Sequence, residues 1–157
     1  MSAVAPLASP APAASPALAC HVHKFGGSSL ADAAHIGRLA ALVSADARLR
    51  PVVVSAMAGT TNALVALGDA AAAGVDWKPG WEALRQRHLE TADAFESEAG
   101  GPLHVTLETE FAALARDLHD HASGVDPHAH DARLARIHGC GEQLSSRLAQ
   151  AALGPDW

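Results

Sequence analysis

The chain has 157 residues, of which 49% are hydrophobic and 18% charged, and its formal net charge is −6 at pH 7. A chain of this length suits one domain and can bury a substantial core. The negative charge, with no cluster of lysine or arginine, argues against a nucleic-acid partner and against an anionic membrane surface. No apolar run reaches the roughly 18 to 20 residues that span a bilayer. The two cysteines, Cys20 and Cys140, form no CxxC pair, so a reducing cytoplasm is the expected location.

Residues 1–18 form a low-complexity segment of alanine, proline and serine, "MSAVAPLASPAPAASPAL". Four prolines interrupt it, and no basic residues precede its apolar part, so it does not have the pattern of a secretory signal peptide. We expect a disordered tail over residues 1–18, followed by a folded region over residues 19–157.

The first folded elements predicted are a strand and a helix. The run "ACHVHKF" at 19–25 is β-prone and ends in "GGSS". Ser29 and Asp32 have the spacing of a capping box, which predicts a helix over 30–49, ended by Pro51. The next run, "PVVVSAM", is typical of a strand buried on both faces. The loop "AGTT" and a second helix over 62–73 follow, with Gly74 at the C-cap.

Beyond residue 74 the apolar side chains recur at helical spacing in three stretches, 81–95, 103–118 and from about 127 to 151. In the last stretch, Gly139 and Gly141 either interrupt the helix or let another backbone approach closely. The order strand, helix, strand, helix predicts an α/β fold with a parallel sheet flanked by helices. Because only two strands are recognisable, we expect this sheet to be incomplete.

The turn after the first strand is a candidate anion site. Backbone N–H groups after a glycine turn, at the start of a helix, attract anions. Gly26 and Gly27 could cradle phosphate oxygens, Ser28 could donate a hydroxyl, and Lys24 could add a full positive charge. The alternative is an ordinary β-to-α turn in which Lys24 is solvated and Ser29 only caps the helix.

The second strand ends in "SAMAGTTN", which is also small and hydroxylated. Because both strands end at the same edge of a parallel sheet, Ser55, Thr60, Thr61 and Asn62 are expected beside the first turn. The alternative is a Ser/Thr-rich loop in which Asn62 caps a helix.

Glu142 lies in "GCGEQLSSRL", a stretch whose other residues are expected to face the core. A buried carboxylate needs a partner. That partner could be Arg147 or Arg136, in a structural ion pair, or the ammonium group of a bound ligand.

Three motifs together, "KFGGSS" at 24–29, "VVVSAMAGTTNAL" at 52–64 and "GEQLSSRL" at 141–148, resemble the amino-acid kinase superfamily, and the aspartokinases most closely. The resemblance implies an amino-acid-kinase-like fold in which residues 19–157 are the amino-terminal part of the kinase domain, in a truncated chain that lacks the ATP-binding half. It implies phosphoryl transfer from MgATP to L-aspartate, giving 4-phospho-L-aspartate, the first step towards lysine, threonine and methionine. It also allows a homo-oligomer of the full-length protein.

The resemblance also implies roles for the residues of the phosphate turn. Lys24 matches the family's lysine that contacts the transferring phosphoryl oxygens. Gly26, Gly27 and Ser28 would line the turn around the phosphate. Ser28 stands where aspartokinases usually have threonine, and it keeps the hydroxyl.

Substrate-binding residues follow from the same resemblance. Ser55 and Thr61 would hold the substrate, and Glu142 would receive its α-ammonium group. The two substrates implied are L-aspartate and ATP, with Mg²⁺ as part of the ATP complex.

Other functions remain as alternatives. The chain could be a non-catalytic remnant or interaction module, with its amphipathic helices as the binding surface, or another member of the superfamily. A histidine-rich stretch, residues 119–131, could bind a metal through His119, His121, His128 and His130. However, the two histidines of an H-x-H pair on a helix point to different faces, so metal binding is the less favoured alternative.

Overall fold

The computed structural model describes residues 20–46, 51–96, 98, 100–124, 126–155 and 157, so the predicted tail over residues 1–18 lies outside the described residues. The elements in chain order are β1 (His23–Phe25), the short 3-10 helix η1 (Gly27–Leu30), α1 (Ala33–Ser44), β2 (Val52–Val54), α2 (Thr60–Ala72), α3 (Lys78–Ala92), α4 (Pro102–Ala122), η2 (Pro127–Ala129) and α5 (His130–Leu153). The predicted α/β class is confirmed, and a helix is present in every stretch where the spacing predicts one.

The sheet of the described residues consists of β1 and β2, which are parallel and pair His23 with Val52, Lys24 with Val53 and Phe25 with Val54. Phe25 and Val54 pack towards the core, whereas Lys24 and Val53 lie on the opposite face. Val53 is 49% exposed, so the prediction that this strand is buried on both faces is wrong for the described residues. A run of valines reports β-propensity, but it does not report how many layers cover the strand.

The start of α1 also differs from the prediction. Asp32, not Ser29, is the N-cap, and its Oδ1 accepts a hydrogen bond from the His35 backbone N–H at 2.9 Å. Ser29 belongs to η1, where its own N–H donates to the Gly26 carbonyl. The capping interpretation of Ser29 is therefore wrong, because Asp32 is itself a strong N-cap and begins the helix one turn later. The predicted end at residue 49 is also wrong, because α1 ends at Ser44 with Ala45 as its C-cap, both within the described residues.

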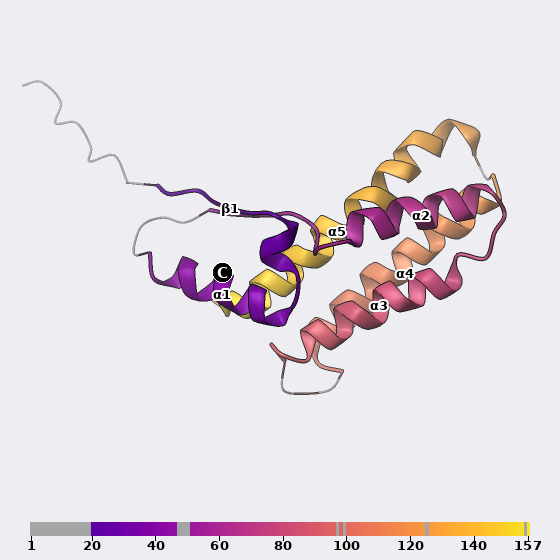
Figure 1. Cartoon of the computed structure of the whole chain (residues 1–157). Helices are drawn as coiled ribbons and strands as arrows, with labels where there is room; N and C mark the ends of the chain where they lie inside the picture. Colours follow the sequence, from indigo (N-terminus) through magenta and orange to yellow (C-terminus); the bar gives the residue numbers. More distant parts are fainter. Residues whose placement is uncertain (1–19, 47–50, 97, 99, 125, 156) are drawn as a thin grey trace, which may run out of the picture.

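The core lies around α5, which packs against α1, α2, α4 and the end of β2. Figure 1 shows α5 running from the side of α1 and the strands to the side where α2, α3 and α4 lie together. Its long apolar stripe packs against α1 and β2 at one side and against α2 and α4 at the other. The strands are therefore fixed relative to the helical region. The largest buried aliphatic and aromatic side chains of the core are Leu30, Ile36, Leu39, Leu64, Leu107, Phe111, Leu118, Ile137, Leu144 and Leu148.

Of the helices that the structure describes, not one has both the length and the apolar character required to span a lipid bilayer.

Candidate functional site

The turns that follow the two strands lie against each other. We call residues 26–31 the first turn and residues 55–62 the second turn. A Cβ carbon added to Gly27 would lie 3.0 Å from the Ala56 carbonyl oxygen and 3.7 Å from the Ala58 Cα carbon. The backbone of the second turn therefore lies so close to position 27 that a side chain there would require the turn to shift by a few tenths of an ångström.

The third motif reaches the same place through α5. A Cβ carbon on Gly141 would lie 2.8 Å from the Ala56 Cβ carbon and 3.0 Å from the Thr60 Cγ2 carbon. By contrast, a Cβ carbon on Gly139 would meet nothing within 4 Å. Since α5 continues through both positions, the interruption is not observed. Gly141 does permit a close approach, but the atoms that approach it are side-chain carbons and not another backbone. The three motifs thus converge on Ala56.

A hollow of about 350 Å³ opens between the first and second turns. Four of the predicted site residues line it, namely Gly27, Ser28, Ser55 and Thr61. The rest of its wall comes from the second turn, and consists of Ala56, Met57, Ala58, Gly59 and Asn62. The structure therefore brings Ser28 of the first turn together with Ser55 and Thr61 of the second, as the strand order predicts, whereas Thr60 is fully buried and does not line the hollow.

Lys24 lies at the edge of this arrangement. Its side chain is exposed on the open face of the sheet, and it is not among the residues that line the hollow. Its Nζ atom lies 3.7 Å from the point that a Cβ carbon on Gly26 would occupy, so the ammonium group folds back over the first turn. The structure therefore places this cation beside Gly26, next to Gly27, which does line the hollow.

The N-terminus of α2 faces the hollow. Gly59, with a φ of +81°, precedes the helix, and no side chain caps its first turn. The prediction that Asn62 could cap this helix is wrong, since Asn62 lies inside the helix and lines the hollow instead. Uncapped N–H groups at a helix start carry a partial positive charge that favours anions. Together with two turns rich in hydroxyls, this end of α2 makes the hollow suitable for a phosphate or a carboxylate.

Glu142 is placed differently from the expectation. Its side chain is exposed, because the buried face of α5 runs through Cys140, Gly141 and Leu144 while position 142 points outward. The expectation of a buried carboxylate is therefore wrong, and it fails because one residue along a helix rotates the side chain by roughly 100°.

Both arginines considered as partners of Glu142 are engaged elsewhere. Arg147 pairs with Glu110 at 3.4 Å, and Arg136 pairs with Asp117 at 2.6 Å. Among the described residues, no side chain forms an ion pair or a hydrogen bond with Glu142. The carboxylate therefore lies in solvent, one residue after Gly141, which contacts the second turn.

A residue that the sequence did not indicate also belongs to this region. Arg87, on α3, donates hydrogen bonds to the Ala58 carbonyl at 2.7 Å and to the Ala31 carbonyl at 2.9 Å. No motif links position 87 to the glycine turns. The available signal was a positive charge within an amphipathic helix, which is ordinarily a solvated side chain.

The histidine-rich stretch is divided by the fold. The rings of His121 and His130 lie 4.9 Å apart, centroid to centroid, and His121 is buried near the end of α4. Within the described residues, no group of three or more histidine, cysteine or carboxylate side chains has the geometry to hold a metal ion. The geometry thus gives no support to the metal-binding alternative.

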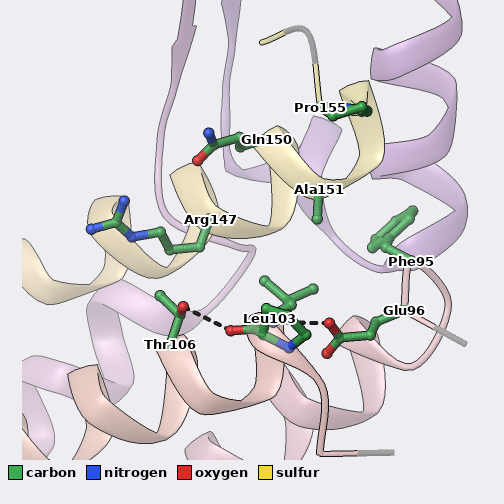
Figure 2. A pocket seen from close by; sticks show the side chains of 10 residues that line it. Phe95, Glu96, Leu103, Thr106, Arg147, Gln150, Ala151 and Pro155 are labelled. Atoms are coloured by element: carbon green, nitrogen blue, oxygen red, sulfur yellow. Dashed lines mark hydrogen bonds between the residues drawn. The ribbon is translucent and has the colours of Figure 1, made fainter. Parts of the chain in front are cut away.

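A second hollow, of about 360 Å³, lies between the start of α4 and the end of α5 (Figure 2). Its polar groups are already engaged: Glu96 accepts hydrogen bonds from the backbone N–H groups of Leu103 and His104, and Thr106 donates to the Pro102 carbonyl. Gln150 donates to the Trp157 carbonyl. The hollow between the two turns, which has uncapped amides and hydroxyls, is therefore the better candidate for a ligand.

Comparison with known proteins agrees with this geometry. The model of the amino acid kinase family matches residues 19–155, which is most of the chain and includes all three motifs. The chain belongs to the amino acid kinase family. The fold that the resemblance implies is therefore confirmed, and the two glycine turns and α5 are parts of that family's domain.

Individual relatives are aspartokinases of Escherichia coli. Lysine-sensitive aspartokinase 3 of strain K12 is 54% identical over 48 residues, which are 31% of this chain and 11% of that protein. The crystal structure of E. coli aspartokinase III with lysine and aspartate (T-state) superposes with a TM-score of 0.68 at 28% identity. The structure of the same enzyme with aspartate and ADP (R-state) gives 0.67 at 28% identity. Each match covers 84% of this chain and 28% of the solved one, so the chain spans little more than a quarter of that enzyme.

Proposed function

We propose that this chain carries the phosphate turn and the aspartate-binding side of an aspartate kinase, which transfers the γ-phosphoryl group of MgATP to the side-chain carboxylate of L-aspartate. The observation that carries the proposal is the convergence of three separate segments on Ala56, around one hollow lined by Gly27, Ser28, Ser55 and Thr61. The similarity to E. coli aspartokinase III, which has been solved with aspartate and ADP, supports the choice of substrate.

Phosphoryl transfer depends on positioning and on neutralising charge, and the residues present can do both. The ammonium group of Lys24, folded over Gly26, would neutralise the phosphoryl oxygens. The N–H groups of Gly27 and Ser28, and the uncapped start of α2, would hold oxygens by fixed dipoles. Mg²⁺ would enter as part of the ATP complex.

L-Aspartate needs partners for a carboxylate and for an ammonium group. The hydroxyl groups of Ser55 and Thr61 line the hollow and can donate to a carboxylate. Glu142 is one residue beyond Gly141, which touches the second turn, and its carboxylate has no ion-pair partner among the described residues. A ligand ammonium group at this edge would supply the missing counter-charge. The proposed product, 4-phospho-L-aspartate, would be the cytoplasmic precursor of lysine, threonine and methionine.

Ligand binding by the chain itself tests the proposal, because the phosphate turn should bind the phosphate groups of MgADP even in a chain that lacks the rest of the ATP-binding half. Amide NMR spectra would be recorded during titration with MgADP, L-aspartate, and L-glutamate as the specificity control. We expect shifts at Gly27, Ser28 and Thr61, with L-aspartate binding more tightly than L-glutamate. No shift at these amides with either MgADP or L-aspartate would contradict the proposal.

Variants separate the two ligands. Lys24→Gln should weaken MgADP binding about 10-fold or more, as expected for loss of one charged hydrogen bond. Lys78→Gln is the matched control, because Lys78 is the other lysine of the chain and lies at the start of α3. Glu142→Gln should weaken the binding of L-aspartate and leave the binding of MgADP unchanged. In a full-length parent protein, where turnover can be measured by trapping the acyl phosphate with hydroxylamine, Lys24→Ala should lower kcat and Glu142→Ala should chiefly raise KM for L-aspartate.

A further inference from the structure

We propose that Arg87 is a positioning residue that holds the two turns of the ligand site at a fixed separation, by donating one hydrogen bond to each. This inference rests on the proposed function, because it concerns the geometry of the same site. It adds a residue that lies outside all three motifs and comes from α3.

The geometry of the contact is a fork. Arg87 Nη1 lies 2.7 Å from the Ala58 carbonyl oxygen and Nη2 lies 2.9 Å from the Ala31 carbonyl oxygen. The two acceptors belong to different segments, one to the second turn and one to the residue directly after η1. The guanidinium group is planar and presents its donors at a fixed spacing, so it sets the distance between two acceptors as well as binding each.

Arg87 acts from behind the site. Ala58 lines the hollow, and Ala31 directly follows η1, which contains Gly27 and Ser28. Arg87 itself does not line the hollow, so its replacement removes no direct ligand contact. Arg87 restrains the backbone of the second turn at Ala58. The next residue, Gly59, has a φ of +81°, and glycine by itself leaves the backbone more conformational freedom than other residues do.

The helix that carries Arg87 is itself firmly held. His88, the next residue, is fully buried, and its ring packs edge-on against Phe111 of α4 at 5.5 Å between centroids. Thr91 donates its hydroxyl to the Arg87 carbonyl at 2.8 Å. The guanidinium group therefore extends from a rigid part of the core to two turns near the molecular surface.

The charge of Arg87 also favours an anion. Among the described residues no carboxylate pairs with it, whereas Arg85, two positions earlier, is bound to both Glu82 and Glu108. The positive charge behind the hollow is thus not cancelled locally. Removing this charge should weaken the binding of a phosphate ligand. Removing only the forked pair of hydrogen bonds, with the charge kept, should weaken it as well.

Two variants and one control separate the fork from the charge. Arg87→Gln removes both. Arg87→Lys keeps the charge and most of the aliphatic stem, yet a single ammonium group does not reproduce the fixed spacing of the fork. Arg116→Gln, at an exposed position of α4, changes the net charge equally and touches neither turn. Arg87→Lys provides the test if Arg87→Gln does not fold.

The first measurement is amide hydrogen exchange without ligand. We expect both Arg87 variants to speed exchange about 10-fold at residues 28–31 and at residues 58–61 together, while the buried amides of Leu144 and Leu148 on α5 are unchanged. The control Arg116→Gln should leave all of these rates as they are. Unchanged exchange at the turns, or a change at one turn only, would overturn the inference, and so would Arg87→Lys behaving as the unsubstituted chain.

The second measurement is the affinity for MgADP. We expect about 10-fold weaker binding in both Arg87 variants and no change in the control. Faster exchange at both turns in the variants, with no binding of MgADP by the unsubstituted chain, would support the clamp and count against the proposed function. Normal MgADP binding with unaltered exchange at the turns would overturn the clamp alone.

Discussion

Gly141 of α5 lies so close to Ala56 that a Cβ carbon at position 141 would come within 2.8 Å of the Ala56 Cβ carbon. Replacing Gly141 by alanine must therefore push α5 away from the second turn. We expect Gly141→Ala to lower the free energy of unfolding by about 1–3 kcal/mol, which is the usual cost of overpacking. Urea denaturation followed by circular dichroism measures this change.

The matched control is Gly139→Ala, two residues away on the same helix, where a Cβ carbon would meet nothing within 4 Å. There the helix propensity of alanine should raise the free energy of unfolding by about 0.5–1 kcal/mol. If Gly141→Ala were as stable as Gly139→Ala, α5 would not lie against the second turn.

The corner between α3 and α4 should depend on the charge of His104. Its Nδ1 lies 2.8 Å from Glu96 and its Nε2 lies 2.9 Å from Asp93. These carboxylates raise the pKa of His104 above its usual value, the hydrogen bond to Glu96 being the largest cause. A raised pKa in the folded state gives stability that is complete below the unfolded pKa near 6.5 and is lost as pH rises through the folded pKa.

His104→Ala should therefore cost more at pH 6 than at pH 9, with a difference of about 1 kcal/mol at most because the pair is near the surface. Denaturation in urea at the two pH values gives the difference. His119→Ala, at an exposed position of α4, is the control for the loss of a surface histidine. An equal cost for His104→Ala at pH 6 and pH 9 would mean that the ion pairs do not hold the corner.

His88 should have the opposite effect. It is fully buried against Phe111, and burial lowers its pKa below the usual value. A lowered pKa gives stability that is present above pH 6.5 and is lost as pH falls from there through the folded pKa. Below pH 6.5 the unfolded chain binds a proton at His88 that the folded protein does not bind, and this difference favours unfolding.

We expect His88→Leu to flatten the loss of stability between pH 6.5 and pH 5 and to change stability at pH 8 by less than about 1.5 kcal/mol. Thermal unfolding over that pH range measures it. Part of the acid sensitivity should remain, since burial also lowers the pKa of His121. An unaltered pH profile would place the source of acid sensitivity elsewhere.

The two cysteines should differ strongly in reactivity. Cys140 is 5% exposed, and burial raises the pKa of its thiol to about 12, whereas Cys20 is exposed. Because the thiolate is the nucleophile, iodoacetamide at pH 8 should modify Cys20 within minutes and leave Cys140 intact until the protein is unfolded. Peptide mass spectrometry with and without urea distinguishes the two sites. Rapid labelling of Cys140 in the folded protein would contradict its burial.

Much of this architecture was predictable from the sequence because the relevant signals are local. Helical spacing placed the buried faces of α1, α4 and α5, and "GGSS" and "AGTT" placed the turns after the strands. The parallel order of the two strands then predicted that Ser28 and Thr61 would share one edge of the sheet, and both line the hollow.

The features that the sequence did not predict depend on three-dimensional geometry, which the spacing of residues along the chain does not encode. Glu142 was expected to be buried because its neighbours are, but its place on the helix turns it into solvent. Arg87 donates hydrogen bonds to two carbonyls that lie 29 and 56 positions away in the chain, and no local sequence pattern predicts such contacts. Val53 was expected to be covered because valine runs are common in central strands, yet coverage depends on which other layers are present.

Each described strand is hydrogen-bonded along one edge and leaves its other edge free, and the open face beside them carries Val53. Unprotected edges with β-branched side chains add strands from neighbouring molecules, which leads to aggregation. The charge of Lys24, on that same face, would then act as a gatekeeper against self-association, in addition to the ligand contact proposed for it. We expect its removal to lower solubility as well as the proposed ligand affinity, so Lys24→Gln is best studied in dilute solution, with light scattering alongside.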